Sequence, residues 1–147
     1  MDLENIFSKA LEASKRGDLD EAERLYIEAL KISELPEIWN NLGNVYRRKG
    51  LLAKAVDSFK RALEMDPNYK TALLNLALTF LDLERYGEAL MIAKRLEGEG
   101  FESNELKIVM AVSLAKLGRY AEFMEVKKKL GRDFDHILRD YGIDMLK

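Results

Sequence analysis

The sequence predicts an all-α protein in which antiparallel helix pairs stack one on another. Two observations support this fold class. Residues with matching roles recur at a nearly constant interval, because Ile6, Trp39, Leu73 and Lys107 stand 33, 34 and 34 positions apart. Each interval also contains two stretches with the apolar spacing of an amphipathic helix, separated by a turn. A repeat of this length is typical of a solenoid, since one helix pair cannot bury its apolar face alone.

Columns of similar residues run through all four intervals. One column, in the first helix of each pair, holds only small residues: Ala10, Gly43, Ala77 and Ala111. Small side chains at this position allow two helix backbones to approach closely. A turn column follows it: Gly17, Gly50, Glu84 and Gly118. Helices often end at a residue with positive φ, which glycine adopts easily, so this column predicts the end of each first helix.

The first helix pair is predicted over residues 3–35. Its second helix begins after Gly17, where Asp18 and, three residues later, Glu21 have the spacing of a capping box. We therefore expect these two side chains to satisfy free backbone N–H groups at the start of that helix.

The second pair, over residues 36–69, carries the clearest pattern. The positions that define this pattern are Trp39, Leu42, Gly43 and Tyr46, then Ala55, Phe59, Ala62 and Pro67. These residues and the 34-residue period resemble the signature of the tetratricopeptide repeat. The resemblance covers about residues 3–137 as four repeats. It implies a right-handed superhelical solenoid that forms a single domain.

The third and fourth repeats depart from this signature. The third, over residues 70–103, keeps the small and apolar columns but has Glu84 at the turn position. The fourth, over residues 104–132, has Phe123 where alanine is usual and Lys127 where an aromatic residue is usual. We therefore expect the second helix of the fourth repeat to pack at an altered angle.

Residues 133–142 are predicted to form a C-terminal capping helix, which a repeat array needs because its last apolar face is otherwise open. The helical apolar stripe consists of Phe134, Ile137, Leu138 and Tyr141. Asp133 is expected to cap the start of this helix and Gly142 to end it. For the short tail that follows, an alternative is that Met145 and Leu146 reach into a groove of this chain or of a neighbouring copy.

The composition disfavours several classes of function. A formal net charge of −2 and a pI near 5.6 argue against a nucleic acid as the main ligand. There is no cysteine, so disulfides and thiolate chemistry are excluded. The most apolar stretch, residues 71–83, contains Asn75 and is shorter than the roughly 18 residues of a membrane span, so no membrane partner is expected.

The expected location is the cytoplasm. The N-terminus lacks the basic and then apolar order of a signal peptide. Glutamine is absent while lysine and glutamate are abundant, which favours a heat-adapted source.

The resemblance implies that the first helices of the repeats line a concave groove, and that this groove binds peptides of other proteins. Ten residues on the groove face are the candidate peptide-binding residues: Phe7, Leu11, Asn40, Asn41, Asn44, Leu74, Asn75, Leu78, Ile108 and Val112. In the first and fourth repeats, the positions equivalent to Asn41 and Asn75 are occupied by Ser8 and Val109.

Asparagines and apolar residues on this face suggest two kinds of contact. Asn41 and Asn75 are 34 residues apart, so they should lie side by side and bond the N–H and C=O groups of a peptide backbone. The alternative is that they bond neighbouring backbone or water. The apolar residues would form a patch large enough to need a cover, such as a partner helix, an apolar peptide or a second copy. The alternative for them is burial between repeats.

The resemblance also allows one class of partner to be tested. Family members that hold the acidic C-terminus of a heat-shock chaperone use lysine, asparagine and arginine on three successive first helices. On the first three repeats the basic residues would stand near Phe7 and at Thr71 and Asn75. On the last three they would stand at Asn40, Glu105 and Val109. No lysine or arginine occupies these positions, so a chaperone carboxylate clamp is not expected.

No catalytic chemistry is expected. The only histidine, His136, has Asp133 and Asp140 about one helical turn away on either side. These three could share a metal, although acidic residues beside a surface histidine are the commoner arrangement. We therefore expect no enzyme activity, no cofactor and no metal.

The function expected from the sequence is a non-catalytic adaptor that binds an apolar or extended peptide of another protein in its groove. The alternative is a self-assembly module, a homo-oligomer in which the C-terminal segment of one copy fills the groove of another. A nucleic-acid-binding helical repeat is disfavoured, because the predicted inner face has almost no positive charge.

Overall fold

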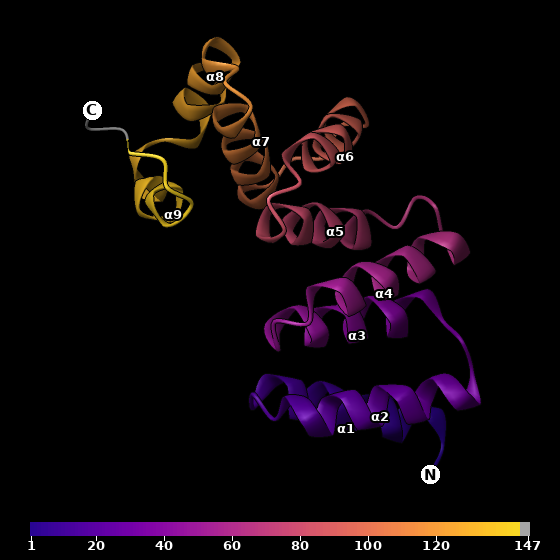
Figure 1. Cartoon of the computed structure of the whole chain (residues 1–147). Helices are drawn as coiled ribbons and strands as arrows, with labels where there is room; N and C mark the ends of the chain where they lie inside the picture. The colour runs from indigo at the N-terminus through magenta and orange to yellow at the C-terminus, as the bar shows by residue number, and fades with distance from the viewer. Residues whose placement is uncertain (145–147) are drawn as a thin grey trace. The chain divides into compact units, whose positions relative to one another are not determined.

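The structure is a computed structural model that describes residues 1–144. Within these residues every regular element is a helix (Figure 1). The helices are α1 (Leu3–Lys15), α2 (Leu19–Ile32), α3 (Pro36–Arg48), α4 (Leu52–Met65), α5 (Lys70–Asp82), α6 (Tyr86–Gly98), α7 (Asn104–Lys116), α8 (Tyr120–Leu130), the 3-10 helix η1 (Arg132–Phe134) and α9 (Asp135–Asp140).

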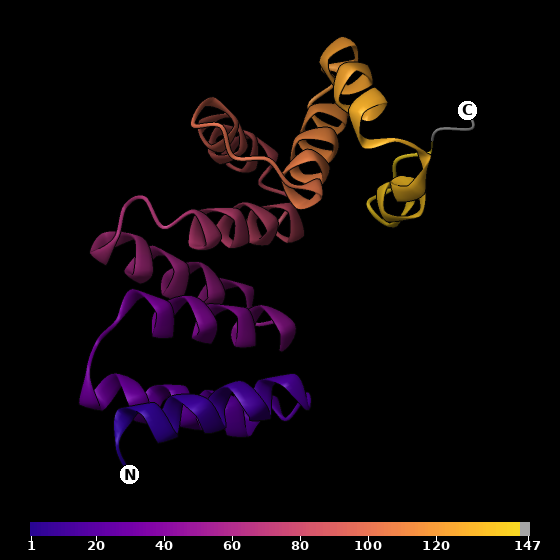
Figure 2. The same ribbon diagram turned by 180° about the vertical axis from the view of Figure 1, so that it is seen from behind.

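Two compact units divide the chain. Unit 1 comprises residues 1–79, and unit 2 begins at Phe80. Unit 1 contains the helix pairs α1–α2 and α3–α4 together with residues 70–79 of α5, and the two pairs are seen from both sides in Figures 1 and 2. Unit 2 contains α6 to α9. The helices α1 to α8 fall within the four predicted repeats.

The predicted turn column has one backbone geometry throughout. Gly17, Gly50 and Gly118 have φ values of 79°, 78° and 76°, and Glu84 has a φ of 59°. At Glu84 the backbone N–H donates to the carbonyl of Leu81 (2.9 Å), as the N–H of Gly17 does to Ser14 (3.0 Å). A glutamate in this left-handed region is strained, because its β-carbon crowds the following carbonyl. The fold therefore imposes the glycine conformation on a residue that does not favour it.

The caps of the first two helices differ. Asp2 precedes α1 with a ψ of 170°, and its Oδ1 accepts a hydrogen bond from the Asn5 N–H (2.9 Å). The predicted capping box of α2 is wrong, since Asp18 makes no side-chain cap bond. Its N–H is held by the Ala13 carbonyl (2.9 Å), and its ψ is 76° rather than extended. Asp18 therefore lacks the extended backbone of a capping residue, and Glu21 pairs with Arg24 instead.

The small column serves close packing between the helices of a pair. A β-carbon built on Gly43 of α3 would stand 2.6 Å from Cε1 of the Phe59 ring in α4. The Phe59 side chain is fully buried. Position 43 consequently tolerates no side chain while the Phe59 ring keeps its place.

A polar contact joins the first repeat to the second at the end of α3. Lys49 Nζ lies 2.7 Å from Asp20 Oδ1 and 2.7 Å from Glu23 Oε1, both on α2. Hydrogen bonds to Asp20 and then to Glu23 raise the pKa of Lys49 above its usual value. Lys49 therefore stays charged at neutral pH and links α2 to the C-terminal end of α3.

The core of unit 2 includes a cluster of Leu90, Leu114 and Phe123, with Ile143 packed against it. Phe123 thus replaces the usual alanine as a core residue. Lys127 is 9% exposed, and its Nζ donates to the Gly131 carbonyl (3.0 Å) and lies 2.8 Å from Asp135 Oδ1. The lysine that replaces the usual aromatic residue therefore ties α8 to α9.

The capping helix is shorter than predicted. It spans Asp135–Asp140, and Asp133 does not cap it, because residues Arg132–Phe134 already form a 3-10 turn. Of the predicted apolar stripe only Leu138 is fully buried. Gly142 ends the helix as predicted, with a φ of 83° and its N–H donating to the Arg139 carbonyl (2.8 Å).

Candidate functional site

The candidate site lies on unit 1, where the first helices of successive repeats lie side by side. At one end Arg48 Nη1 of α3 donates to the carbonyl (2.8 Å) and hydroxyl (2.9 Å) oxygens of Ser14 in α1. Asn75 Nδ2 of α5 donates to Asn40 Oδ1 of α3 (3.0 Å). Helices α1 and α3 and residues 70–79 of α5 therefore present adjacent surfaces.

Seven of the ten predicted residues are half-buried on these helices and so remain partly accessible. We call this set the first-helix face: Phe7, Leu11, Asn41, Asn44, Leu74, Asn75 and Leu78. It combines four apolar side chains with three amides. An amide offers both a donor and an acceptor, while the apolar side chains offer contact area.

Asn40 is a correction to the predicted set. Its side chain is 3% exposed and accepts the hydrogen bond from Asn75, so a peptide cannot reach it. It also hydrogen-bonds the hydroxyl of Tyr69. The predicted pairing of Asn41 with Asn75 is replaced by a pairing of Asn40 with Asn75, because position 40 faces the neighbouring helix.

Asn41 and its neighbours form a second polar contact. The Asn41 side chain hydrogen-bonds the Tyr26 hydroxyl of α2. Burial raises the pKa of Tyr26 to about 12, and the nearby Glu37 carboxylate adds to this rise. Burial also raises the pKa of Tyr69, again with Glu37 as the next cause. Both hydroxyls therefore stay protonated at neutral pH beside a carboxylate.

Ile108 and Val112 are further corrections. They are 8% and 0% exposed, and Val109 between them is fully buried. In the stretch from Leu106 to Leu114 every residue except Lys107 is buried. A helix that is apolar on all sides is a core helix, so α7 contributes neither residue to a binding surface. The alternative of burial between repeats is the correct one for this pair.

A hollow that sequence analysis missed opens at the N-terminal ends of α1 and α3. It encloses about 210 Å³, and we call it the α1–α3 hollow: Leu3, Glu4, Phe7, Leu35, Glu37 and Ile38 line it. Phe7 packs edge-to-face on Tyr26, with 6.0 Å between ring centroids and 70° between ring planes. Only Phe7 belonged to the predicted set. The available signal was the pair Glu4 and Glu37, which occupy the first turns of successive first helices.

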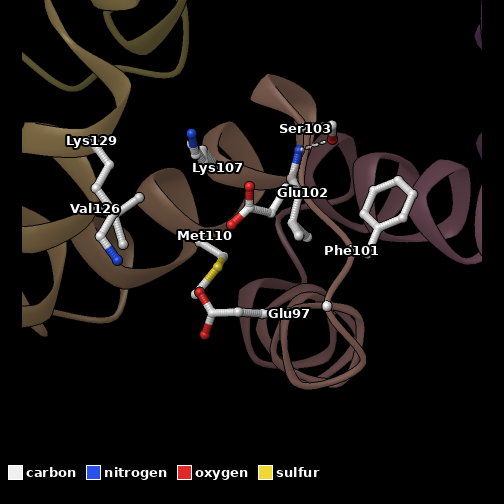
Figure 3. Close-up of a pocket in the computed structure, with 10 residues that line it drawn as sticks. Glu97, Phe101, Glu102, Ser103, Lys107, Met110, Val126 and Lys129 are labelled. Carbon is white, nitrogen blue, oxygen red and sulfur yellow. Dashed lines mark hydrogen bonds between the residues drawn. The ribbon is translucent and has the colours of Figure 1, made fainter.

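A second hollow lies in unit 2 and encloses about 100 Å³. Figure 3 shows Val126 and Lys129 of α8 on one side and Met110 of α7 with Glu97 of α6 on the other. Ser103 beside it caps α7 by accepting a hydrogen bond from the Leu106 N–H (3.0 Å). Carboxylates and ammonium groups both line this hollow, so its charge selects no ligand class.

The C-terminal segment lies against its own chain as far as Asp144. Ile143 packs on the cluster of Leu90, Leu114 and Phe123 in unit 2. Met145 and Leu146, the candidate groove-filling residues, lie outside the described residues. Self-assembly through this segment stays a prediction.

Two further observations bear on the expected chemistry. Within residues 1–144, no group of three or more histidine, aspartate or glutamate side chains could hold a metal ion. No helix in the same part of the chain has the length and apolar character needed to cross a membrane.

Tandem helix pairs whose first helices present half-buried amide and apolar side chains define a helical-repeat scaffold for protein interactions. Models described as the tetratricopeptide repeat match residues 10–34, 36–69 and 55–100. The chain belongs to the tetratricopeptide-repeat family. The family and the all-α solenoid class predicted from the internal period are thus confirmed.

Curated relatives share part of their length with this chain. The BBSome complex member BBS4 of Mus musculus is 31% identical over 102 residues, which is 69% of this chain and 20% of that protein. The Photosystem I assembly protein Ycf3 of Synechococcus sp. (strain CC9605) is 32% identical over 85 residues, 55% of this chain and 47% of that protein. The chain therefore spans between a fifth and about half of these relatives.

Solved structures support the fold. The Sgt2 tetratricopeptide-repeat domain from Aspergillus fumigatus matches with a TM-score of 0.74 and 25% identity, covering 81% of each chain. A tetratricopeptide repeat protein from Parabacteroides merdae matches with a TM-score of 0.77 and 24% identity, covering 97% of this chain and 55% of that one. The first such domain of Spaghetti (RPAP3), solved with an HSP90 peptide, matches with a TM-score of 0.74 and 21% identity, covering 79% and 93%.

Proposed function

We propose that this protein is a non-catalytic adaptor that binds an extended peptide segment of another protein along the first-helix face of unit 1. The observation that carries the proposal is that accessible amides of α3 and α5 lie on the same face as accessible apolar side chains of α1 and α5. The amides match the backbone groups of an extended peptide, and the apolar residues match its side chains.

The accessible amides differ in whether they already form hydrogen bonds within the protein. Asn75 uses its Nδ2 donor on Asn40, and Asn41 bonds Tyr26. Asn44 is half-buried between Leu11 and Leu78 in the repeat register. Asn44 is therefore the amide best placed to bond a peptide, with Asn41 and Asn75 held in fixed orientations beside it.

The names of the curated relatives agree with a scaffold role. One is named as a member of a protein complex and the other as an assembly protein. Because this chain spans only part of each, the partners of those proteins are not transferred. The lack of lysine and arginine at the positions of the carboxylate clamp directs the proposal towards peptides that lack an acidic C-terminus.

The proposal is tested by selecting peptides from a random display library on the full chain and measuring their affinity by fluorescence anisotropy. Leu78→Asp and Asn44→Ala should each weaken binding about tenfold or more, as replacements at the centre of an interface do. The matched control is Ile32→Asp, which places the same charge at an apolar position of α2 that is 52% exposed. Circular dichroism should show all three variants to be folded.

Two outcomes would count against this proposal. One is selected peptides whose affinity is unchanged by Leu78→Asp and by Asn44→Ala. The other is an equal loss in the Ile32→Asp control, which would place the peptide elsewhere. A mass that rises with protein concentration in light scattering would favour self-assembly instead.

A further inference from the structure

The α1–α3 hollow has the chemistry of a receptor for a long, positively charged side chain. Its walls are apolar, since Leu3, Phe7, Leu35 and Ile38 contribute four of its six lining residues. Of these, Ile38 is fully buried and Leu35 is 40% exposed. The methylene stem of a lysine or arginine can be buried along such walls while its charged end stays near water.

The only ionisable residues that line the hollow are acidic. Glu4 and Glu37 are both exposed, and each stands in the first turn of its helix. Acidic residues in a first turn offset the helix dipole. That role does not require the two carboxylates to share an apolar hollow, as they do here.

Glu37 also lies near two buried tyrosines. Burial is the largest cause of the raised pKa values of Tyr26 and Tyr69, and the charge of Glu37 adds to both. The Phe7 ring is fixed by its edge-to-face contact with Tyr26. An aromatic ring attracts a cation that lies over its face, and the Phe7 ring is one of the residues that line the hollow.

We propose that the α1–α3 hollow binds the side chain of a lysine or arginine in the partner peptide. This inference rests on the proposed function, because Phe7 belongs to both the hollow and the first-helix face. Charge complementarity decides the occupant. An acidic side chain would be repelled by Glu4 and Glu37, and a wholly apolar one would gain no attraction from their charges.

The experiment uses methyl-labelled full-length protein and three blocked tetrapeptides, Ac-Ala-Leu-X-Ala-NH2, in which X is lysine, norleucine or glutamate. Methyl signals of Leu3, Leu35 and Ile38 report on the hollow, and those of Leu74 and Leu78 report on the rest of the first-helix face. The lysine peptide should shift the hollow signals with an affinity about fivefold above that of the norleucine peptide, as expected for two exposed ion pairs. The glutamate peptide should not shift them.

Two double variants separate local from general electrostatics. Glu4→Gln with Glu37→Gln should abolish the preference for lysine over norleucine while keeping side-chain size. Glu12→Gln with Asp57→Asn removes the same net charge at exposed positions outside the hollow and should keep the preference.

Several results would overturn the inference. Equal affinity of the lysine and norleucine peptides would assign an apolar side chain to the hollow. Loss of the preference in the Glu12 and Asp57 control would show a general charge effect. Hollow signals that shift with protein concentration alone would place a second copy there.

The outcomes also separate this inference from the proposed function. If the lysine peptide shifts the hollow signals and leaves those of Leu74 and Leu78 unchanged, the hollow binds a basic side chain, and the proposal that peptides bind along the first-helix face is wrong. If all three peptides shift the signals of Leu74 and Leu78 equally and none shifts the hollow signals, peptides bind along the first-helix face and the inference about the hollow is wrong.

Discussion

Gly43 of α3 and Phe59 of α4 are in such close contact that a β-carbon on Gly43 would stand 2.6 Å from the edge of the ring. Carbon atoms do not approach this closely without a shift of one partner. In the repeat that shows the tetratricopeptide signature most clearly, the glycine therefore belongs to packing rather than to backbone conformation. This position is helical, and no positive φ is required there.

Gly43→Ala should destabilise the protein by about 1–3 kcal/mol, the usual range for overpacking a core. Helix propensity alone predicts the opposite sign, a gain of about 1 kcal/mol. Urea unfolding followed by circular dichroism decides between them. The control is Gly87→Ala in α6, where an added β-carbon meets nothing within 4 Å and no packing loss is expected. A Gly43→Ala variant as stable as the natural protein would contradict the contact.

Glu84→Gly should stabilise the protein by about 0.5–1 kcal/mol, because Glu84 is held at a φ of 59° that glycine adopts without steric strain. The reverse change at an equivalent turn, Gly17→Ala, should destabilise it by a similar amount. Thermal unfolding of both variants provides the comparison. A loss of stability in Glu84→Gly would mean that the glutamate side chain contributes more than its backbone costs.

Asn40 and Asn75 should be energetically coupled, since Asn75 donates to the buried oxygen of Asn40. Either single alanine substitution leaves a polar group without its partner and should cost about 1–3 kcal/mol. The double variant should cost less than the sum of the two single changes, which a double-mutant cycle in urea measures. Asn44→Ala, which removes an accessible amide from the same face, should have a much smaller effect. Strict additivity for Asn40 and Asn75 would argue that the bond does not contribute.

The stability of the protein should fall as the pH rises from about 10, the usual pKa of tyrosine, to about 12, the pKa of Tyr26 in the folded chain. A raised pKa in the folded state means that the unfolded chain loses this proton first. The stabilisation is therefore complete below pH 10 and is lost as the pH approaches 12. Urea midpoints measured across this range should fall less steeply for Tyr26→Phe than for the natural protein. Parallel slopes would show that Tyr26 does not titrate differently in the folded and unfolded chains.

The internal period predicted most of the backbone because helix ends and turns depend on local residues. The turn column predicted the ends of four helices. At Glu84 the period alone predicted the turn, because the residue there is not a glycine. The predicted capping box at Asp18 failed because a capping side chain needs an extended backbone, and the preceding turn fixes Asp18 at a ψ of 76°. Asp2, with a ψ of 170°, shows the geometry that succeeds.

The surface was harder to predict because successive helical residues point about 100° apart. That one step separates buried Asn40 from accessible Asn41. The burial of Ile108 and Val112 could have been expected from the sequence. The apolar residues of α7 are distributed around the whole helix, so no polar face indicates which side is exposed. The α1–α3 hollow combines Leu3 and Phe7 of the first repeat with Ile38 of the second, and no single helical pattern displays that combination.

Lys127 bears on how the array can be lengthened by design. The signature usually has an aromatic residue at the position of Lys127, whereas this lysine contacts Gly131 and Asp135. An extra repeat joined after Leu130 would therefore pack against an ammonium group in place of an aromatic ring. Extension at that end therefore requires replacing Lys127 and removing α9 together. Copies of residues 36–69 inserted between the second and third repeats would leave this terminus intact.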